Sequence, residues 1–180
     1  SIFIAASELK NQEAVSTAKG TNISVKNLFY NIPARRKFLK SDSTELRNVT
    51  NEFLRVALTN PEIAFSLSNN GTVLYDLPVS GLRQRIVNIF GKTINSRLIT
   101  VKCDTSLVKI EGFVCSPEQA RKTYGEQYFF VNNRFMKHSF FHKAVMEAYS
   151  GLLGADNIPS YFLYFTVDPS MVDVNIHPTK

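Results

Sequence analysis

The chain has 180 residues, 44% of them hydrophobic, and a formal net charge of +6 at pH 7. This composition can fill a buried core in one or two domains, which excludes a disordered protein. No apolar run approaches the roughly 18 residues that span a bilayer, so we expect no membrane partner. The excess of basic residues favours an anionic partner. The two cysteines, Cys103 and Cys115, match no metal-site spacing, which predicts free thiols in a reducing compartment.

The first third of the chain predicts two strands followed by an amphipathic helix. Residues 1–6 and 22–29 alternate or cluster apolar side chains as strands do. A helix start follows, where Asp42 can act as the cap and Glu45 can close a capping box. Apolar residues then recur at helical spacing until the Asn60-Pro61 pair ends the helix. We expect this apolar stripe to pack in the core.

A β-hairpin comes next, followed by the segment that we expect to join two domains. Strands at 63–68 and 72–77 flank Asn70-Gly71, a pair that readily adopts the positive φ angles of a tight turn. Residues 78–81 combine two turn-forming residues with a valine and a serine. We therefore place a domain boundary after residue 77.

The second predicted domain, 78–180, alternates strands with two helices. Ser80 can cap a short helix whose apolar face begins at Leu82, and Gly91 suits the end of that helix. The later strands and the second helix are expected at 98–101, 107–115, 127–131, 134–136, 139–152 (the helix), 160–167 and 172–176. This order predicts an α+β fold whose two-layer second domain contains a strand–helix–strand crossover.

The last nine residues combine a predicted strand with a cation. Apolar residues alternate over 172–176, and Pro178 ends the strand because proline has no backbone N–H. Lys180 then follows in a loop anchored by that strand. Such a lysine suits a terminal phosphate oxygen, because its ammonium group is a compact charge with three donors. His177 has no second ligand at metal spacing, so we predict a structural role for it and no metal site.

Three segments together resemble the MutL family of DNA mismatch-repair proteins. They are Gly20–Lys40, with the pattern GT-x-x-x-V-x-x-LFYN-x-PARRKFLK, the FVNNR segment Phe130–Arg134, and the VDVNIHPTK ending. Their order and spacing are those of the family, and they cover nearly the whole chain. Asn133 stands where the family usually has glycine, and Thr179 where alanine is common.

The resemblance implies an ATP-dependent protein of the GHKL superfamily. Residues 1–77 would be the C-terminal part of a GHKL ATP-binding domain, and 78–180 a transducer domain of the ribosomal-protein-like type. Gly20 and Thr21 would bind nucleotide, and Lys180 would contact the γ-phosphate of ATP and contribute to catalysis. The other ATP and Mg²⁺ ligands of such proteins lie upstream of these motifs. We therefore expect the chain to belong to a larger ATPase and to be inactive alone.

Two basic groups are candidates for binding DNA. They are Arg35, Arg36, Lys37 and Lys40, which follow Pro33, and Arg134, Lys137 and Lys143, which lie near the second predicted hairpin. Cations that neutralise backbone phosphates would make DNA affinity fall as salt rises. The alternative for both groups is a solvated surface. No aromatic ladder alternates with these cations, which argues against a stacking platform for single strands.

The resemblance also implies partners and a compartment. Proteins of this family act as ATP-operated clamps, in which nucleotide binding drives self-association of two N-terminal regions. DNA and a mismatch-recognition protein of the MutS type would be further partners. The prevalence of the family in bacteria and the lack of a targeting signal lead us to expect a cytoplasmic protein.

Two other functions remain open at this point. One is a nucleic-acid-binding module without any coupling to ATP, which the basic composition would also suit. The other is a different GHKL ATPase, such as a type II topoisomerase subunit, although the LFYN-x-PARRKF segment does not fit that class. Loss of ATP turnover on Lys180→Ala is expected only if the lysine contacts nucleotide.

Overall fold

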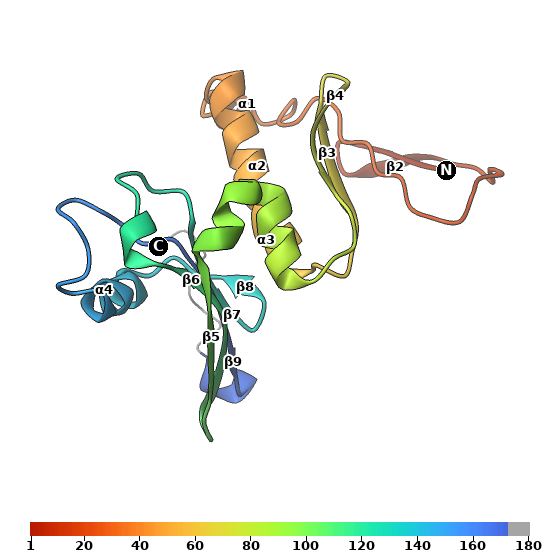
Figure 1. Cartoon of the computed structure of the whole chain (residues 1–180). Helices are drawn as coiled ribbons and strands as arrows, with labels where there is room; N and C mark the ends of the chain where they lie inside the picture. Colours follow the sequence, from red (N-terminus) through yellow and green to blue (C-terminus); the bar gives the residue numbers. More distant parts are fainter. Residues whose placement is uncertain (173–180) are drawn as a thin grey trace. The chain divides into compact units, whose positions relative to one another are not determined.

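A computed structural model describes residues 1–172 of the chain (Figure 1). The chain divides into two compact units, which we call the N-terminal unit (Ser1–Asn48) and the C-terminal unit (Val49–Lys180). The predicted strand at 172–176 and the candidate residue Lys180 fall outside the described part. Among the described helices, none is long and apolar enough to cross a membrane.

The N-terminal unit contains a short hairpin and a single helical turn. Strand β1 (Ile2–Ala5) pairs antiparallel with β2 (Glu8–Gln12), and α1 covers Pro33–Arg36. The strand predicted at 22–29 is wrong, because the chain there forms turns and irregular structure. Asn27 and Phe29 have φ angles of 52° and 63°, which interrupt an extended strand.

Helix α2 (Asp42–Thr59) begins one residue earlier than its predicted cap implied. The carbonyl oxygen of Ser41 accepts the first helical N–H bonds, from Thr44 at 2.8 Å and Glu45 at 2.9 Å. Asp42 is thus the first helical residue and not the cap. Oε1 of Glu45 accepts from the backbone N–H of Lys40 at 2.8 Å, so the carboxylate still stabilises the helix start.

The C-terminal unit continues with the predicted hairpin and a second helix. Strands β3 (Phe65–Asn69) and β4 (Thr72–Leu77) are joined by Asn70 and Gly71, whose φ angles of 49° and 80° confirm the tight turn. Helix α3 (Leu82–Phe90) starts after Gly81, followed by a 3₁₀ helix, η1 (Lys92–Arg97). Ser80 does not cap α3, because its hydroxyl is buried without a hydrogen-bond partner among the described residues.

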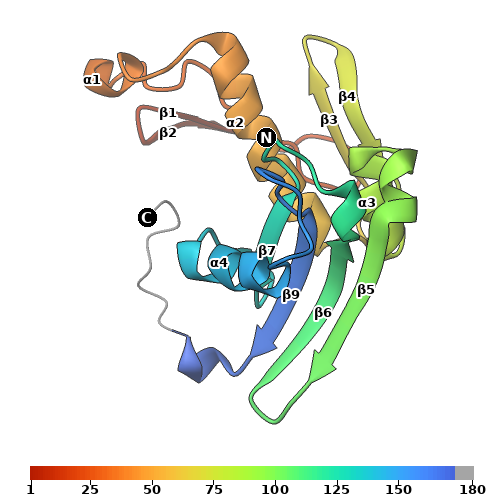
Figure 2. The same cartoon turned by 60° about the vertical axis from the view of Figure 1, so that its left-hand side comes forward.

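A five-stranded mixed sheet forms the centre of the C-terminal unit (Figure 2). Its strand order is β5-β6-β9-β7-β8, and only the pairing between β7 and β9 is parallel. Helix α4 connects those two strands, which confirms the predicted strand–helix–strand crossover. The bounds are β5 Leu98–Asp104, β6 Val108–Cys115, β7 Gln127–Val131, β8 Arg134–Phe135, α4 Ser139–Ala148 and β9 Tyr161–Val167, with short 3₁₀ helices at Pro117–Gln119 and Pro169–Met171.

Helices cover both faces of this sheet. On one face, Phe130 and Phe162 pack with Leu58 of α2 and Ile86 of α3, and all four side chains are fully buried. On the other face, Phe129 of β7 stacks on Phe141 of α4, with ring centroids 4.3 Å apart. Neighbouring residues of β7 thus point to opposite faces, as expected for a strand buried on both sides. The α+β fold is confirmed.

Candidate functional site

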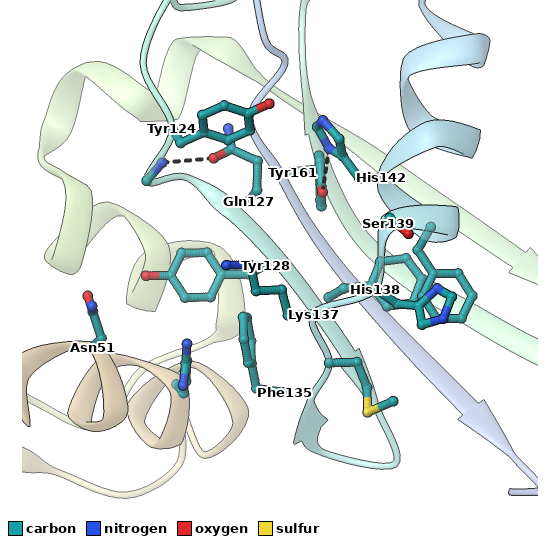
Figure 3. Close-up of a pocket in the computed structure, with 15 residues that line it drawn as sticks. Asn51, Tyr124, Gln127, Tyr128, Phe135, Lys137, His138, Ser139, His142 and Tyr161 are labelled. Atoms are coloured by element: carbon teal, nitrogen blue, oxygen red, sulfur yellow. Dashed lines mark hydrogen bonds between the residues drawn. The ribbon is translucent and has the colours of Figure 1, made fainter. Parts of the chain in front are cut away.

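A groove of about 1080 Å³ runs along the β7–β8 edge of the sheet in the C-terminal unit (Figure 3). Its walls come from α2, from the loop before β7, from the two strands, and from the start of α4. β8 pairs only with the last two residues of β7, so the first half of β7 borders the groove. The groove therefore lies beside the part of β7 that β8 leaves unpaired.

Arg55 of α2 is held in place over one wall of the groove. Its guanidinium carbon lies 3.9 Å from the centre of the Phe135 ring, and its side chain also forms an ion pair with Glu52. A guanidinium over an aromatic face is attracted by the ring quadrupole. The carboxylate and the ring together restrict the side chain, so its charge is kept at a defined place in the groove.

The opposite wall contains two histidines with different roles. Nδ1 of His138 accepts from the backbone N–H of Phe140 at 3.2 Å and so caps α4, which requires this nitrogen to be unprotonated. Nδ1 of His142 lies 3.1 Å from the hydroxyl of Tyr161. Burial raises the pKa of Tyr161 to about 12, so at neutral pH the phenol is protonated and can donate to His142.

Aromatic rings and basic side chains share the lining of this groove. Tyr124 is 70% exposed at its mouth, with its ring centroid 5.8 Å from that of His142. Arg55, which also pairs with Glu52, and Lys137 are the cationic side chains of the described lining, which includes no aspartate or glutamate. An anionic ligand with planar rings suits such a surface chemically.

The structure separates the members of the second basic group. Lys137 lines the groove, between β8 and α4. Arg134 is exposed at the start of β8, and Lys143 is exposed on α4, where its ammonium lies 3.9 Å from the carboxylate of Glu147. Neither Arg134 nor Lys143 is a lining residue. Sequence reasoning did not single out Arg55 or Tyr124, which join this surface only through the fold.

The first basic group lies in the N-terminal unit and is exposed throughout. Arg35 and Arg36 form the last turn of α1, where their charges complement the negative end of the helix. Lys37 and Lys40 follow directly and are also exposed. Arg36 lines a small hollow of about 110 Å³ together with Tyr30. All four side chains are thus accessible to a ligand.

Gly20 and Thr21 lie in the exposed segment between β2 and α1. A Cβ atom at Gly20 would meet nothing within 4 Å, so a ligand can approach the backbone closely there. Both residues are thus accessible from solvent. Among residues 1–172, no group of histidine, cysteine, aspartate and glutamate side chains could hold a metal ion. Lys180, the third predicted nucleotide contact, lies outside the described residues.

Comparison with known proteins assigns both sequence and fold to one family. The family model described as "DNA mismatch repair protein, C-terminal domain" matches residues 86–180. The DNA mismatch repair protein MutL of Bacteroides fragilis is 58% identical over 179 residues, and that of Phocaeicola vulgatus is 55% identical. Each alignment covers 99% of this chain but only 29% of the relative, so the chain spans less than a third of these proteins.

Solved structures agree with the sequence comparisons. The Aquifex aeolicus MutL ATPase domain complexed with ADP superposes with a TM-score of 0.62 and 26% identity, covering 81% of this chain and 52% of that domain. A lysine-to-asparagine variant of the same domain gives a TM-score of 0.60 and 28% identity, covering 84% of this chain and 54% of that domain. The chain therefore has the fold of the C-terminal part of such an ATPase domain.

Proposed function

The chain belongs to the MutL family of DNA mismatch-repair proteins, and we propose that it acts in mismatch repair as part of an ATP-operated clamp. The observation that carries this proposal is the 58% identity to a MutL protein over 99% of the chain. On this proposal, residues 1–77 complete an ATP-binding domain and residues 78–180 form the transducer domain. A cytoplasmic location, self-association on ATP binding and a MutS-type partner belong to the same proposal.

The proposed nucleotide contacts are Gly20, Thr21 and Lys180. The open space at Gly20 and the exposed position of Thr21 support a phosphate contact, and the similar Aquifex domain is described as complexed with ADP. ATP with Mg²⁺ would supply the phosphoryl group for transfer. The hydroxyl of Thr21 can donate to a phosphate oxygen, and Lys180 would stabilise negative charge on the γ-phosphate.

The proposed DNA surface includes the groove of the C-terminal unit. Lys137 and Arg55 provide positive charge in the groove, and no acidic residue is present in its described lining. Arg134 and Lys143 lie outside the groove and would extend the basic surface. In the N-terminal unit, the exposed cations Arg35, Arg36, Lys37 and Lys40 are the second candidate surface. Phosphate contacts of this kind position DNA without reading its sequence.

Equilibrium binding of a fluorescent duplex to the full-length gene product tests the DNA surface. We expect Lys137→Ala to weaken binding and to reduce the slope of log K against log salt by about 1, as for one lost phosphate contact. Lys109→Ala is the matched control, because Lys109 is on β6, outside the groove lining, and pairs with Glu111 at 3.0 Å. Identical salt slopes for both variants and the unaltered protein would remove Lys137 from the DNA surface.

A DNA-binding module without ATP coupling is the competing function. It would bind DNA in the same salt-dependent way, but it would have no ATP turnover for Lys180→Ala to abolish. A DNA-binding measurement thus tests the proposed DNA surface, which both functions share. ATP turnover distinguishes the ATP-operated clamp from the module without ATP coupling.

A further inference from the structure

We infer that Asn132 is a positioning residue that fixes the start of the segment leading to Lys180. This inference rests on the proposed nucleotide contact of Lys180. Asn132 is the first residue of the turn between β7 and β8, directly after the end of β7, the strand next to β9. From there its side chain reaches the last residue of β9, from which the chain continues toward Lys180.

The side-chain amide of Asn132 pairs with the backbone of Val167 as a peptide group would. Its Oδ1 accepts from the N–H of Val167 at 3.0 Å, and its Nδ2 donates to the carbonyl oxygen of Val167 at 3.1 Å. The backbone N–H of Asn132 also donates to the carbonyl oxygen of Phe165 at 2.8 Å. The backbone pairing of β7 with β9 ends at Val131 and Phe165, so this amide extends the pairing by a further step.

This pairing requires the chemistry of an asparagine. One short side chain must donate and accept at the same time, which an aspartate or a serine cannot do in this geometry. The residue must also adopt a φ angle of 47°, and asparagine tolerates this region better than most other residues. The neighbouring Asn133 has a φ angle of 63° but forms no side-chain bond to β9 among the described contacts. The two turn residues therefore share a backbone conformation and differ in their contacts.

The chain is fixed again directly after Val167. Oδ1 of Asp168 accepts from the N–H of Ser170 at 2.8 Å and from its hydroxyl at 2.7 Å, which caps the 3₁₀ helix Pro169–Met171. These bonds hold the pKa of Asp168 below its ordinary value, so the carboxylate is charged at neutral pH. Asn132 bonds the backbone of Val167, and Asp168 caps the turn that follows. Together these contacts fix the backbone path of the chain where it leaves β9.

ATP hydrolysis by the full-length gene product tests the role of Asn132, with Asn132→Gly compared to Asn133→Gly. Glycine permits the turn conformation at both positions, so only the first variant loses a contact with β9. We expect Asn132→Gly to lower kcat roughly tenfold, because misplaced catalytic groups cost rate steeply, with ADP affinity unchanged. We expect Asn133→Gly to stay within about twofold of the unaltered protein, because it removes no side-chain contact with β9 among the described residues.

A second variant and a second measurement keep the test decisive. Asn132→Asp keeps the acceptor and the turn preference but loses the donor to Val167, so its kcat should also fall. This variant replaces Asn132→Gly in the test if Asn132→Gly proves poorly folded. Amide hydrogen exchange should be faster over 168–172 in both Asn132 variants, and also at Val167 in Asn132→Gly, which loses the acceptor for that N–H. A purely structural defect would lower kcat and ADP-binding capacity in proportion, which would overturn the inference.

The variant Lys180→Ala separates failure of this inference from failure of the proposed function. If Lys180→Ala abolishes turnover while Asn132→Gly and Asn133→Gly match each other, Asn132 has no positioning role and the nucleotide contact stands. If Lys180→Ala leaves turnover unchanged, the proposed contact is wrong, and the inference about Asn132 is overturned with it.

Discussion

The hydroxyl of Tyr164, in β9, donates a hydrogen bond of 3.0 Å to the backbone carbonyl oxygen of Leu58, in α2. Leu58 is in the last turn of its helix, where carbonyl oxygens have no partner within the helix, and it is fully buried. Burial also raises the pKa of Tyr164, so its phenol remains a donor at neutral pH. This bond ties the central sheet to the helix that precedes the hairpin.

Removal of that hydroxyl should destabilise the protein. We expect Tyr164→Phe to lower the free energy of unfolding by about 1–2 kcal/mol, because a buried carbonyl oxygen loses its donor. Urea unfolding followed by circular dichroism measures the change. Tyr124→Phe is the control, since Tyr124 is largely exposed, and it should alter stability by less than about 0.5 kcal/mol. Equal effects of the two substitutions would show that the Tyr164 bond adds nothing.

A buried arginine in α3 makes a second, larger contribution to stability. The guanidinium of Arg85 is fully buried and donates to backbone carbonyl oxygens of segments on both sides of the hairpin. The acceptors are Pro61 at 2.8 Å, Ile63 at 2.6 Å, Pro78 at 3.2 Å and Leu77 at 3.4 Å. Burial lowers the pKa of Arg85, which reflects the cost of keeping this charge from water. The four carbonyl dipoles offset part of that cost.

Arg85→Met should lower the free energy of unfolding by about 3 kcal/mol, because several buried carbonyl oxygens lose their only charged donor. Chemical denaturation at constant pH measures this loss. Lys92→Met, at an exposed position in η1, should change stability by less than about 0.5 kcal/mol. A stability of Arg85→Met equal to that of Lys92→Met would mean that the buried guanidinium offers no net stabilisation.

Gly112 of β6 allows close approach of the neighbouring strand β9. A Cβ atom there would lie 2.0 Å from the carbonyl oxygen of Phe162, and the residue has a φ angle of 143°. We expect Gly112→Ala to prevent folding, because both the clash and the φ angle oppose a side chain. Gly71 has a φ angle of 80° but open space around a Cβ atom. Gly71→Ala should therefore lower the free energy of unfolding by only about 1 kcal/mol, and the protein should still fold. Soluble yield and thermal unfolding distinguish them, and a well-folded Gly112→Ala protein would contradict the expectation.

Local sequence signals predicted the elements that local chemistry controls. Asn70-Gly71 specified the hairpin turn, and the apolar spacing before Asn60 specified α2. Ser80 was misassigned, because an N-cap depends on the backbone path, which places Gly81 at the helix start. The strand predicted at 22–29 was wrong. Apolar composition alone does not show whether a segment has a partner strand to pair with, and it does not reveal the turns at 27–30.

The groove could not be predicted from sequence spacing. Arg55, Tyr124 and His142 come from three distant segments, and only the pairing of β7 with β9 and the packing of α2 bring them together. The basic residue Lys137 was identifiable because it stands near a family motif. Nothing local in the sequence indicated that Arg55 would lie over Phe135, since that contact depends on tertiary packing.

Steady-state ATP hydrolysis by the full-length gene product, with Lys180→Ala beside the control Lys109→Ala, tests the proposed γ-phosphate contact most directly. We predict that Lys180→Ala lowers kcat by about 100-fold or more, as expected for a group that stabilises developing charge, with ADP affinity and folding unchanged. Lys109→Ala should keep its turnover. An unchanged kcat in a folded, ADP-binding Lys180→Ala protein would contradict the contact and leave a DNA-binding role for this chain.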